Sequence, residues 1–173
     1  MRLITHCSSS SGRVFSSPIQ SQSCILNFSS VNELVNYEIV CVSGTYESCL
    51  AASKEGLVFA FGTNGYGQLG LGKETEKVST FTKISSLSGN EIRAVYAGLF
   101  HSFFETREGK ILACGRDHNG ELFLNGGKRN EIVYLPTETT IQGAKFSILG
   151  DSFSAVFIGG DPPPNTPNMH IRW

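Results

Sequence analysis

The sequence predicts an all-β fold built from repeated, antiparallel four-stranded sheets. A short apolar strand that runs into a glycine-rich loop occurs twice, first from Gly56 and again from Gly109. Each copy contains several short strand patterns that end at glycine turns, and no helical pattern of useful length separates them. Strand-rich repeats of this length are typical of the blades of a β-propeller.

The repeat has a spacing of 53 residues, which joins Gly62 to Gly115 and Phe28 to Phe81. The apolar pattern is therefore copied together with the glycines. Upstream of the strand, Gly44 matches Gly98 at a spacing of 54, which predicts one deleted residue in the second copy. A third copy starts at Gly150.

The first elements follow from local patterns. Residues 23–28 are expected to form a short strand, and the capping-box spacing of Ser30 and Glu33 predicts one helical turn before a strand over residues 38–42. In the central strand, residues 57–61 are apolar on both faces, as expected for a strand that is covered on both sides. Glycine after an acidic residue predicts tight hairpin turns at 54–56 and 107–109.

The glycine-rich loop contains the spacing Gly-x-Gly-x-x-Gly between Gly65 and Gly70, which alone would suggest a phosphate-binding loop. No amphipathic helix follows it, although a phosphate site of this kind needs a helix N-terminus. The repeat copy, residues 118–123, lacks two of the three glycines. We therefore expect the glycines to pack the loop against the next blade while Leu69 and Leu122 enter the core.

This pattern of Gly, then His-Ser, an acidic-Gly turn, a strand and Gly-x-Asn-x-x-Gly-Gln-Leu-Gly-x-Gly resembles the repeat of the regulator of chromosome condensation family. The resemblance is strong over residues 38–72 and good over 91–122. Members of that family fold as seven-bladed β-propellers, so the resemblance implies a partial propeller of about three blades. In the family repeat a histidine occupies a turn where Glu47 stands in the first copy and His101 in the second, which implies a structural role for His101.

The resemblance divides the chain into three parts: a serine-rich N-terminal segment (1–24), a repeat region (25–160) and a proline-rich tail (161–173). Clear repeats are expected at about 44–97 and 98–149, with a partial third from 150. Seven blades of this size need on the order of 370 residues. The chain has 173, so it is expected to be either a fragment or divergent short relative of such a propeller, or a chain that self-associates into a ring and so covers its exposed blade faces.

Composition argues against several kinds of site. The net charge is −1 and the basic residues are scattered, so direct nucleic-acid binding is not expected. Five cysteines form no Cys-x-x-Cys pair, so we expect no metal site and buried, reduced thiols at Cys49 and Cys114. No stretch has the length of a signal peptide core or a membrane span, which favours the cytoplasm or nucleus. No catalytic set recurs, and no cofactor is expected.

We therefore expect a non-catalytic protein-protein interaction module, or scaffold, whose partner is another protein. The resemblance leaves one alternative, a guanine-nucleotide exchange factor, or a fragment of one, for a Ran-like small GTPase. Six polar loop residues are the candidate partner-binding residues: Asn64, Tyr66, Gln68, Arg116, Asp117 and His118. Ten glycines are assigned structural roles in the repeats: Gly44, Gly56, Gly62, Gly67, Gly70, Gly98, Gly109, Gly115, Gly120 and Gly150.

Overall fold

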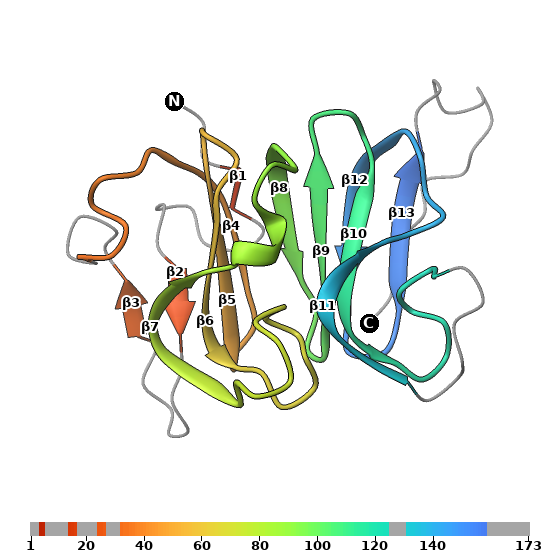
Figure 1. The fold of residues 1–173 in the computed structure, drawn as a ribbon, viewed down its shortest axis with the longest axis horizontal. Helices are drawn as coiled ribbons and strands as arrows, with labels where there is room; N and C mark the ends of the chain where they lie inside the picture. Colours follow the sequence, from red (N-terminus) through yellow and green to blue (C-terminus); the bar gives the residue numbers. More distant parts are fainter. Residues whose placement is uncertain (1–3, 6–13, 17–23, 27–31, 125–130, 159–173) are drawn as a thin grey trace.

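The computed structural model of the protein describes residues 4–5, 14–16, 24–26, 32–124 and 131–158. Within these residues the chain forms β-strands and one short 3-10 helix, which confirms the predicted all-β class (Figure 1). Most of the serine-rich segment and the whole proline-rich tail lie outside the described residues. The predicted boundaries of those two parts stay predictions.

Two sheets form the centre of the molecule, each with four consecutive antiparallel strands that we call blade 1 and blade 2. Blade 1 contains β4 (Ile39–Gly44), β5 (Ser48–Ser53), β6 (Val58–Thr63) and β7 (Lys77–Lys83). Blade 2 contains β8 (Ile92–Ala97), β9 (His101–Thr106), β10 (Ile111–Asp117) and β11 (Glu131–Glu138). Consecutive strands are neighbours in both blades, so the two repeats share one topology.

Shorter elements flank the two blades. A third sheet consists of β12 (Ala144–Leu149) and β13 (Ser154–Ile158), and a further hairpin consists of β2 (Val14–Ser16) and β3 (Cys24–Leu26). Strand β1 (Ile4–Thr5) pairs in parallel with β4, and the 3-10 helix η2 (Ser85–Leu87) connects the blades. Residues 32–36 form turns, so the predicted helical turn after Ser30 is not a helix in its described part.

The strand register corrects one feature of the predicted repeat. Ser48 lies opposite Gly62 in blade 1, and His101 lies opposite Gly115 in blade 2. The corresponding residues of the two blades are 53 positions apart in both cases (101 − 48 and 115 − 62), so no residue is deleted between the copies. His101 therefore corresponds to Ser48 and not to Glu47, and the spacing of 54 between Gly44 and Gly98 is not structural.

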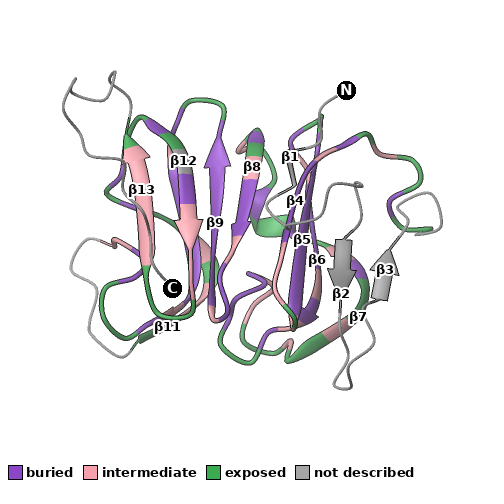
Figure 2. Cartoon of the chain, turned by 180° about the vertical axis from the view of Figure 1, so that it is seen from behind, coloured by how far each residue is buried: buried purple, intermediate pink, exposed green. Residues whose placement is uncertain are grey.

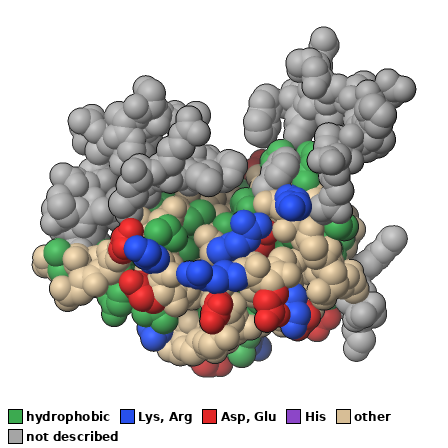
Figure 3. All heavy atoms as spheres, turned by 90° about the horizontal axis from the view of Figure 1, so that it is seen from above, with side chains coloured by type: hydrophobic (Ala, Val, Ile, Leu, Met, Phe, Trp, Pro, Cys, Tyr) green, Lys and Arg blue, Asp and Glu red, His purple; other side chains and the backbone are tan. Residues whose placement is uncertain are grey.

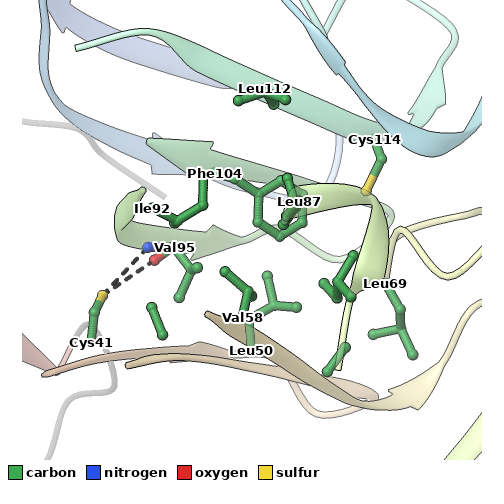
Figure 4. Packing of buried hydrophobic residues seen from close by; sticks show 13 residues of the cluster. Cys41, Leu50, Val58, Leu69, Leu87, Ile92, Val95, Phe104, Leu112 and Cys114 are labelled. Atoms are coloured by element: carbon green, nitrogen blue, oxygen red, sulfur yellow. Dashed lines mark hydrogen bonds between the residues drawn. The ribbon is translucent and has the colours of Figure 1, made fainter. Parts of the chain in front are cut away.

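A cluster of buried apolar side chains joins the two blades. Leu50 and Val58 of blade 1 face Val95 and Phe104 of blade 2 (Figure 4). Leu69 enters the same cluster from the glycine-rich loop, and Leu87 enters it from η2. Since each of these six side chains is at most 2% exposed, the interface between the blades is packed like the interior of a single domain.

The outer faces of the two blades are also buried, as the apolar pattern predicted. Val58 and Ala60 lie in the cluster between the blades, whereas Phe59 points to the opposite face of blade 1 with Val42 and Phe81. On blade 2 the corresponding outer cluster packs against the third sheet and contains Tyr96, Phe103, Ile111, Ala113 and Ala144. Figure 2 shows the second strand of blade 2, β9, buried along its length.

Side chains of β4 bind the backbone of β8, the first strand of the next blade. The Val95 amide donates to Cys41 Sγ at 3.4 Å, and the Ala97 amide donates to Ser43 Oγ at 3.0 Å. Burial raises the pKa of the Cys41 thiol, so it stays protonated. Cys49 and Cys114 are buried in strands and not in disulfides, as predicted, and burial raises the pKa of Cys114 as well.

Candidate functional site

The connections between strands gather at the two ends of the blades. One end, at the bottom of Figure 1, carries the hairpins 45–47, 98–100 and 150–153 together with the loop that follows β6. The other end carries the tight turns 54–56 and 107–109. The six candidate binding residues all belong to the first end, which we call the loop face.

Two aromatic rings and a guanidinium form a row of contacts on the loop face. The rings of Tyr66 and Phe100 meet edge to face at 4.9 Å between centroids, although they belong to different blades. The guanidinium of Arg116 lies 4.1 Å above the Phe100 ring and donates to Ser152 Oγ at 2.8 Å. This row therefore crosses from blade 1 to the third sheet.

We call these residues, with the exposed rings of the two outer hairpins, the aromatic rim: Tyr46, Tyr66, Phe100, Arg116 and Phe153. Tyr46, Tyr66 and Phe153 are exposed, and Phe100 and Arg116 are half-buried. Arg116 is held in place because it is bonded to the 150–153 hairpin and stacked on a ring. A fixed cation among exposed rings suits recognition of another protein, since Tyr, Trp and Arg dominate binding hot spots.

Three of the six predicted binding residues do not face solvent, which corrects their assignment as projecting groups. Asn64 is 1% exposed and binds its own loop: its amide donates to the carbonyls of Gly72 and Thr75, and its oxygen accepts from the Leu69 amide. Side chains of this type often satisfy backbone groups in turns. Asn64 therefore shapes the loop.

Gln68 and Asp117 have the same internal role. The Tyr66 amide donates to Gln68 Oε1 at 2.9 Å, and the Leu122 amide donates to Asp117 Oδ1 at 3.1 Å. Both side chains are buried. Of the predicted set, Tyr66, Arg116 and His118 reach the surface, and only the first two belong to the rim.

The glycine-rich loop lies against the outer strand of the next blade. Gly70 has a φ of +70°, and a Cβ placed there would lie 2.9 Å from the ring of Pro136 in β11. The Gly72 amide donates to the Tyr134 carbonyl of the same strand. The loop thereby fixes Tyr66 relative to blade 2. Among the other assigned glycines, φ is positive at Gly56, Gly62, Gly67, Gly109, Gly115 and Gly120, but not at Gly44, Gly98 or Gly150.

A histidine and a serine meet beneath the rim. His101 Nε2 lies 2.8 Å from Ser154 Oγ, which is the distance expected between a base and a nucleophile. However, His101 is 1% exposed, and burial, with a smaller contribution from the Arg116 charge, lowers its pKa to about 4. A base this weak and inaccessible suits a structural bond between blade 2 and the third sheet.

This buried histidine predicts that stability falls in acid. Since the neutral form is favoured in the folded state, the unfolded chain binds more protons between pH 6.5 and pH 4. The free energy of unfolding should therefore drop by about 2 kcal/mol between pH 7 and pH 5 through His101 alone. Urea titrations at both pH values should show a smaller drop for His101→Gln, whereas His118→Gln, at an exposed histidine, should keep the wild-type drop. Equal drops in all three proteins would contradict this.

A buried carboxylate lies between blade 2 and the third sheet. Glu105 forms an ion pair with Arg93 and accepts a hydrogen bond from the Tyr96 hydroxyl at 2.9 Å. Burial and the Glu105 charge raise the pKa of Tyr96, so the hydroxyl remains a donor. Arg93 also donates to the Lys145 carbonyl of β12 at 3.3 Å. Both Glu105 oxygens are engaged, so this network connects sheets.

The opposite end carries charges of both signs side by side (Figure 3). Lys54 pairs with Glu38 at 2.9 Å, and Lys110 lies within 4 Å of Glu108 and Glu138. No set of three or more His, Cys, Asp or Glu residues in the described ranges could hold a metal ion. In the same ranges no helix is long and apolar enough to cross a membrane. Since these charges of the opposite end are paired with one another, the loop face is the better candidate for a binding surface.

Comparison with known proteins gives consistent matches. Residues 55–104 match the regulator of chromosome condensation (RCC1) repeat. The chain is 42% identical over 135 residues to the probable E3 ubiquitin-protein ligase HERC4 of Rattus norvegicus, covering 78% of this chain and 13% of that protein. It is 39% identical over 79 residues to the secretion-regulating guanine nucleotide exchange factor of Bos taurus, covering 46% of this chain and 17% of that protein.

A solved structure supports the architecture. The crystal structure of Prp20p from Saccharomyces cerevisiae superposes on 80% of this chain and 32% of its own length, with a TM-score of 0.62 and 20% sequence identity. At that identity the likeness shows the fold alone, and it confirms the predicted propeller architecture. The chain spans less than a fifth of the length of the two relatives named above.

Proposed function

We propose that this chain, which carries repeats of the regulator of chromosome condensation (RCC1) family, is a non-catalytic module that binds another protein through the aromatic rim. The observation that carries the proposal is the fixed row of Tyr66, Phe100 and Arg116 across two blades. Such a surface offers rigid anchors that lose little conformational entropy on binding.

Two further features support a binding role over a catalytic one. In the pair of His101 and Ser154 the histidine is buried, and its pKa is lowered to about 4. The buried Glu105 has both oxygens occupied by Arg93 and Tyr96. The ligase activity named for the rat relative is not carried over, because this chain covers 13% of that protein. We place the module in the cytoplasm or nucleus, since the buried cysteines Cys41 and Cys114 are not in disulfides.

Photo-cross-linking from the rim tests this proposal and identifies the partner. A photoreactive phenylalanine at position 66 of the full chain should yield a reproducible adduct in extract from the source cells, whereas the same group at Leu135, on the outer strand of blade 2, should not. The adduct partner is then titrated against purified variants. Adducts of equal yield from both positions would contradict the rim as the binding surface.

Tyr66→Ala is expected to weaken binding of that partner at least tenfold, because a truncated aromatic hot spot typically costs about 2 kcal/mol or more. The free energy of unfolding should change by about 1 kcal/mol or less, since Tyr66 is 41% exposed and loses one ring contact. Lys54→Ala at the opposite end is the control, with unchanged affinity expected. An unchanged affinity of Tyr66→Ala for the partner would contradict the proposal.

The alternative function, nucleotide exchange on a Ran-like small GTPase, is favoured by the similarity to the bovine exchange factor. It is tested by release of fluorescent GDP from such a GTPase. Our proposal predicts a release rate within twofold of the rate without the chain. Acceleration comparable to that of a full-length exchange factor would contradict the proposed non-catalytic function and favour nucleotide exchange.

A further inference from the structure

An open groove of about 500 Å³ lies beside the glycine-rich loop. Its lining comes from residues 63–65, from Lys73, Glu76 and Lys77 in the segment that leads into β7, and from Tyr134 of β11. The groove therefore lies where the loop of blade 1 meets blade 2. Its volume is in the range of pockets that bind ligands, so it is large enough to accept a side chain of another protein.

Hydrogen bonds of Asn64 fix the backbone around the groove. The side-chain amide donates to the carbonyls of Gly72 and Thr75 at 3.0 and 2.7 Å, and the backbone amide donates to the Glu76 carbonyl at 2.7 Å. The Gly72 amide donates in turn to the Tyr134 carbonyl at 3.1 Å. These bonds hold the segment that carries both lysines against the loop and β11, so the groove is a fixed part of the fold.

The groove carries more positive than negative charge. Lys73 and Lys77 line it together with one carboxylate, Glu76. All acidic residues of the chain except Asp161 are described, and none of the described ones forms an ion pair with Lys73 or Lys77. Both lysine side chains are exposed and can reach a ligand. A hollow with an excess of one charge attracts groups of the opposite charge.

The fold does not require a lysine at position 77. In blade 1 Thr63 pairs with Lys77, and in blade 2 the corresponding Arg116 pairs with Ile132. The same register position therefore accepts a half-buried apolar residue. In contrast, a residue that shapes the loop, such as Asn64, has a chemically similar counterpart in the other copy. A charge that the fold does not need, beside a groove, is a candidate for binding.

We propose that this groove binds an anionic side chain of the partner protein, a carboxylate or a phosphorylated hydroxyl, between Lys73 and Lys77. Both kinds of side chain offer anionic oxygens, with which ammonium groups form charge-assisted hydrogen bonds. Apart from its chain neighbours, no heavy atom of the described residues lies within 4 Å of the Cβ position at Gly65, which leaves room for the incoming group.

This inference rests on the proposed protein-binding function and adds the chemistry of the partner. Gly65 lines the groove, and the next residue, Tyr66, belongs to the aromatic rim. A single segment of the partner can therefore contact the rim with one residue and place an anionic side chain in the groove. The charged contact would favour partners with acidic or phosphorylated segments over neutral ones.

Nuclear magnetic resonance titrations of the full chain with short peptides test the groove separately from the rim. The probes are the blocked peptides Gly-Glu-Glu-Gly and Gly-phosphoserine-Gly, with Gly-Gln-Gln-Gly and Gly-Ser-Gly as neutral counterparts. An anionic peptide should shift the amide signals of Gly65 and Lys77 in a saturable manner, and comparison of the two identifies the source of the charge. The absence of a saturable shift with either, or equal shifts with the neutral peptides, would overturn the proposal.

Replacing Lys73 and Lys77 together by glutamine should weaken binding of the better anionic peptide by about fivefold or more, because two ion pairs are lost. Lys83→Gln, at an exposed lysine on the other end of β7, is the matched control and should bind like the wild type. Added salt should weaken wild-type binding more than binding by the double variant. Circular dichroism checks that the variants stay folded. An unchanged affinity of the double variant would show that the peptide binds elsewhere.

Photo-cross-linking from position 66 connects the groove to the partner. The yield of the adduct should fall by about threefold or more in the double variant, and Lys83→Gln should keep the wild-type yield. An undiminished yield in the double variant would contradict the groove as part of the interface and leave the rim intact. If position 66 gives no specific adduct in the wild type, the rim fails, and the peptide titrations alone decide whether the groove binds anionic side chains.

Discussion

Gly115→Ala is expected to lower the free energy of unfolding by about 3 kcal/mol or more. Gly115 has a φ of +116°, and a Cβ there would lie 2.4 Å from both the Phe100 carbonyl oxygen and His101 Cα. An unfavourable backbone conformation costs about 1–3 kcal/mol, and overpacking adds about 1–3 kcal/mol. Because the obstructing atoms are backbone, β9 and the 98–100 hairpin would have to move. Urea unfolding followed by circular dichroism measures the loss.

Two other glycines separate the contribution of the backbone conformation from that of overpacking. Gly120 has a φ of +85° but no atom within 4 Å of its Cβ position, so Gly120→Ala carries the backbone strain alone, about 1–2 kcal/mol. Gly65 has neither feature, so Gly65→Ala should be close to neutral. If Gly115→Ala costs no more than Gly120→Ala, the close approach of β9 and β10 does not require glycine.

The same close approach explains why the fold could be predicted from sequence. Gly62 and Gly115 occupy one register position in the two blades, opposite Ser48 and His101, and a Cβ at either would clash with the backbone of the preceding strand. A glycine fixed by sterics and strands fixed by burial on both faces leave a strong periodic signal. The repeat, the strands and the turns were therefore predictable.

The role of the polar loop residues was harder to predict from the sequence than the strands were. Polar side chains in a loop look exposed in a sequence, but Asn64 and Asp117 both accept from the amide five residues ahead, and Gln68 and Glu121 both accept from the amide two residues behind. Both copies keep a side chain of the same length with an acceptor oxygen. That shared chemistry was the available signal for an internal role.

The aromatic rim was only partly predictable because its contacts join residues that are far apart in the sequence. Tyr66 was among the candidates, but Phe100 lies in a different hairpin, where it supports both Tyr66 and Arg116. Phe153 reaches the same face from the third sheet. Sequence patterns report which face of a strand is buried, whereas contacts between loops of neighbouring blades depend on how the blades stack.

Leu69→Ala is expected to lower the free energy of unfolding by about 2–5 kcal/mol, the range for a fully buried leucine that leaves a cavity. The Leu69 side chain is fully buried in the cluster that contains Leu50 of blade 1 and Phe104 of blade 2. Its backbone amide is held by Asn64 Oδ1 at 2.8 Å, so the loop has little freedom to collapse into the cavity. Chemical unfolding at neutral pH measures the change.

Leu135→Ala on β11 is the matched control, because the same atoms are removed from a side chain that is 51% exposed. It should change stability by no more than about 0.5 kcal/mol. A similarly small effect for Leu69→Ala would mean that the glycine-rich loop rests on the blades without contributing to their packing. Tyr66 would then lack a fixed position relative to Phe100, and the rigidity on which the aromatic rim depends would have to come from Arg116 and the 150–153 hairpin alone.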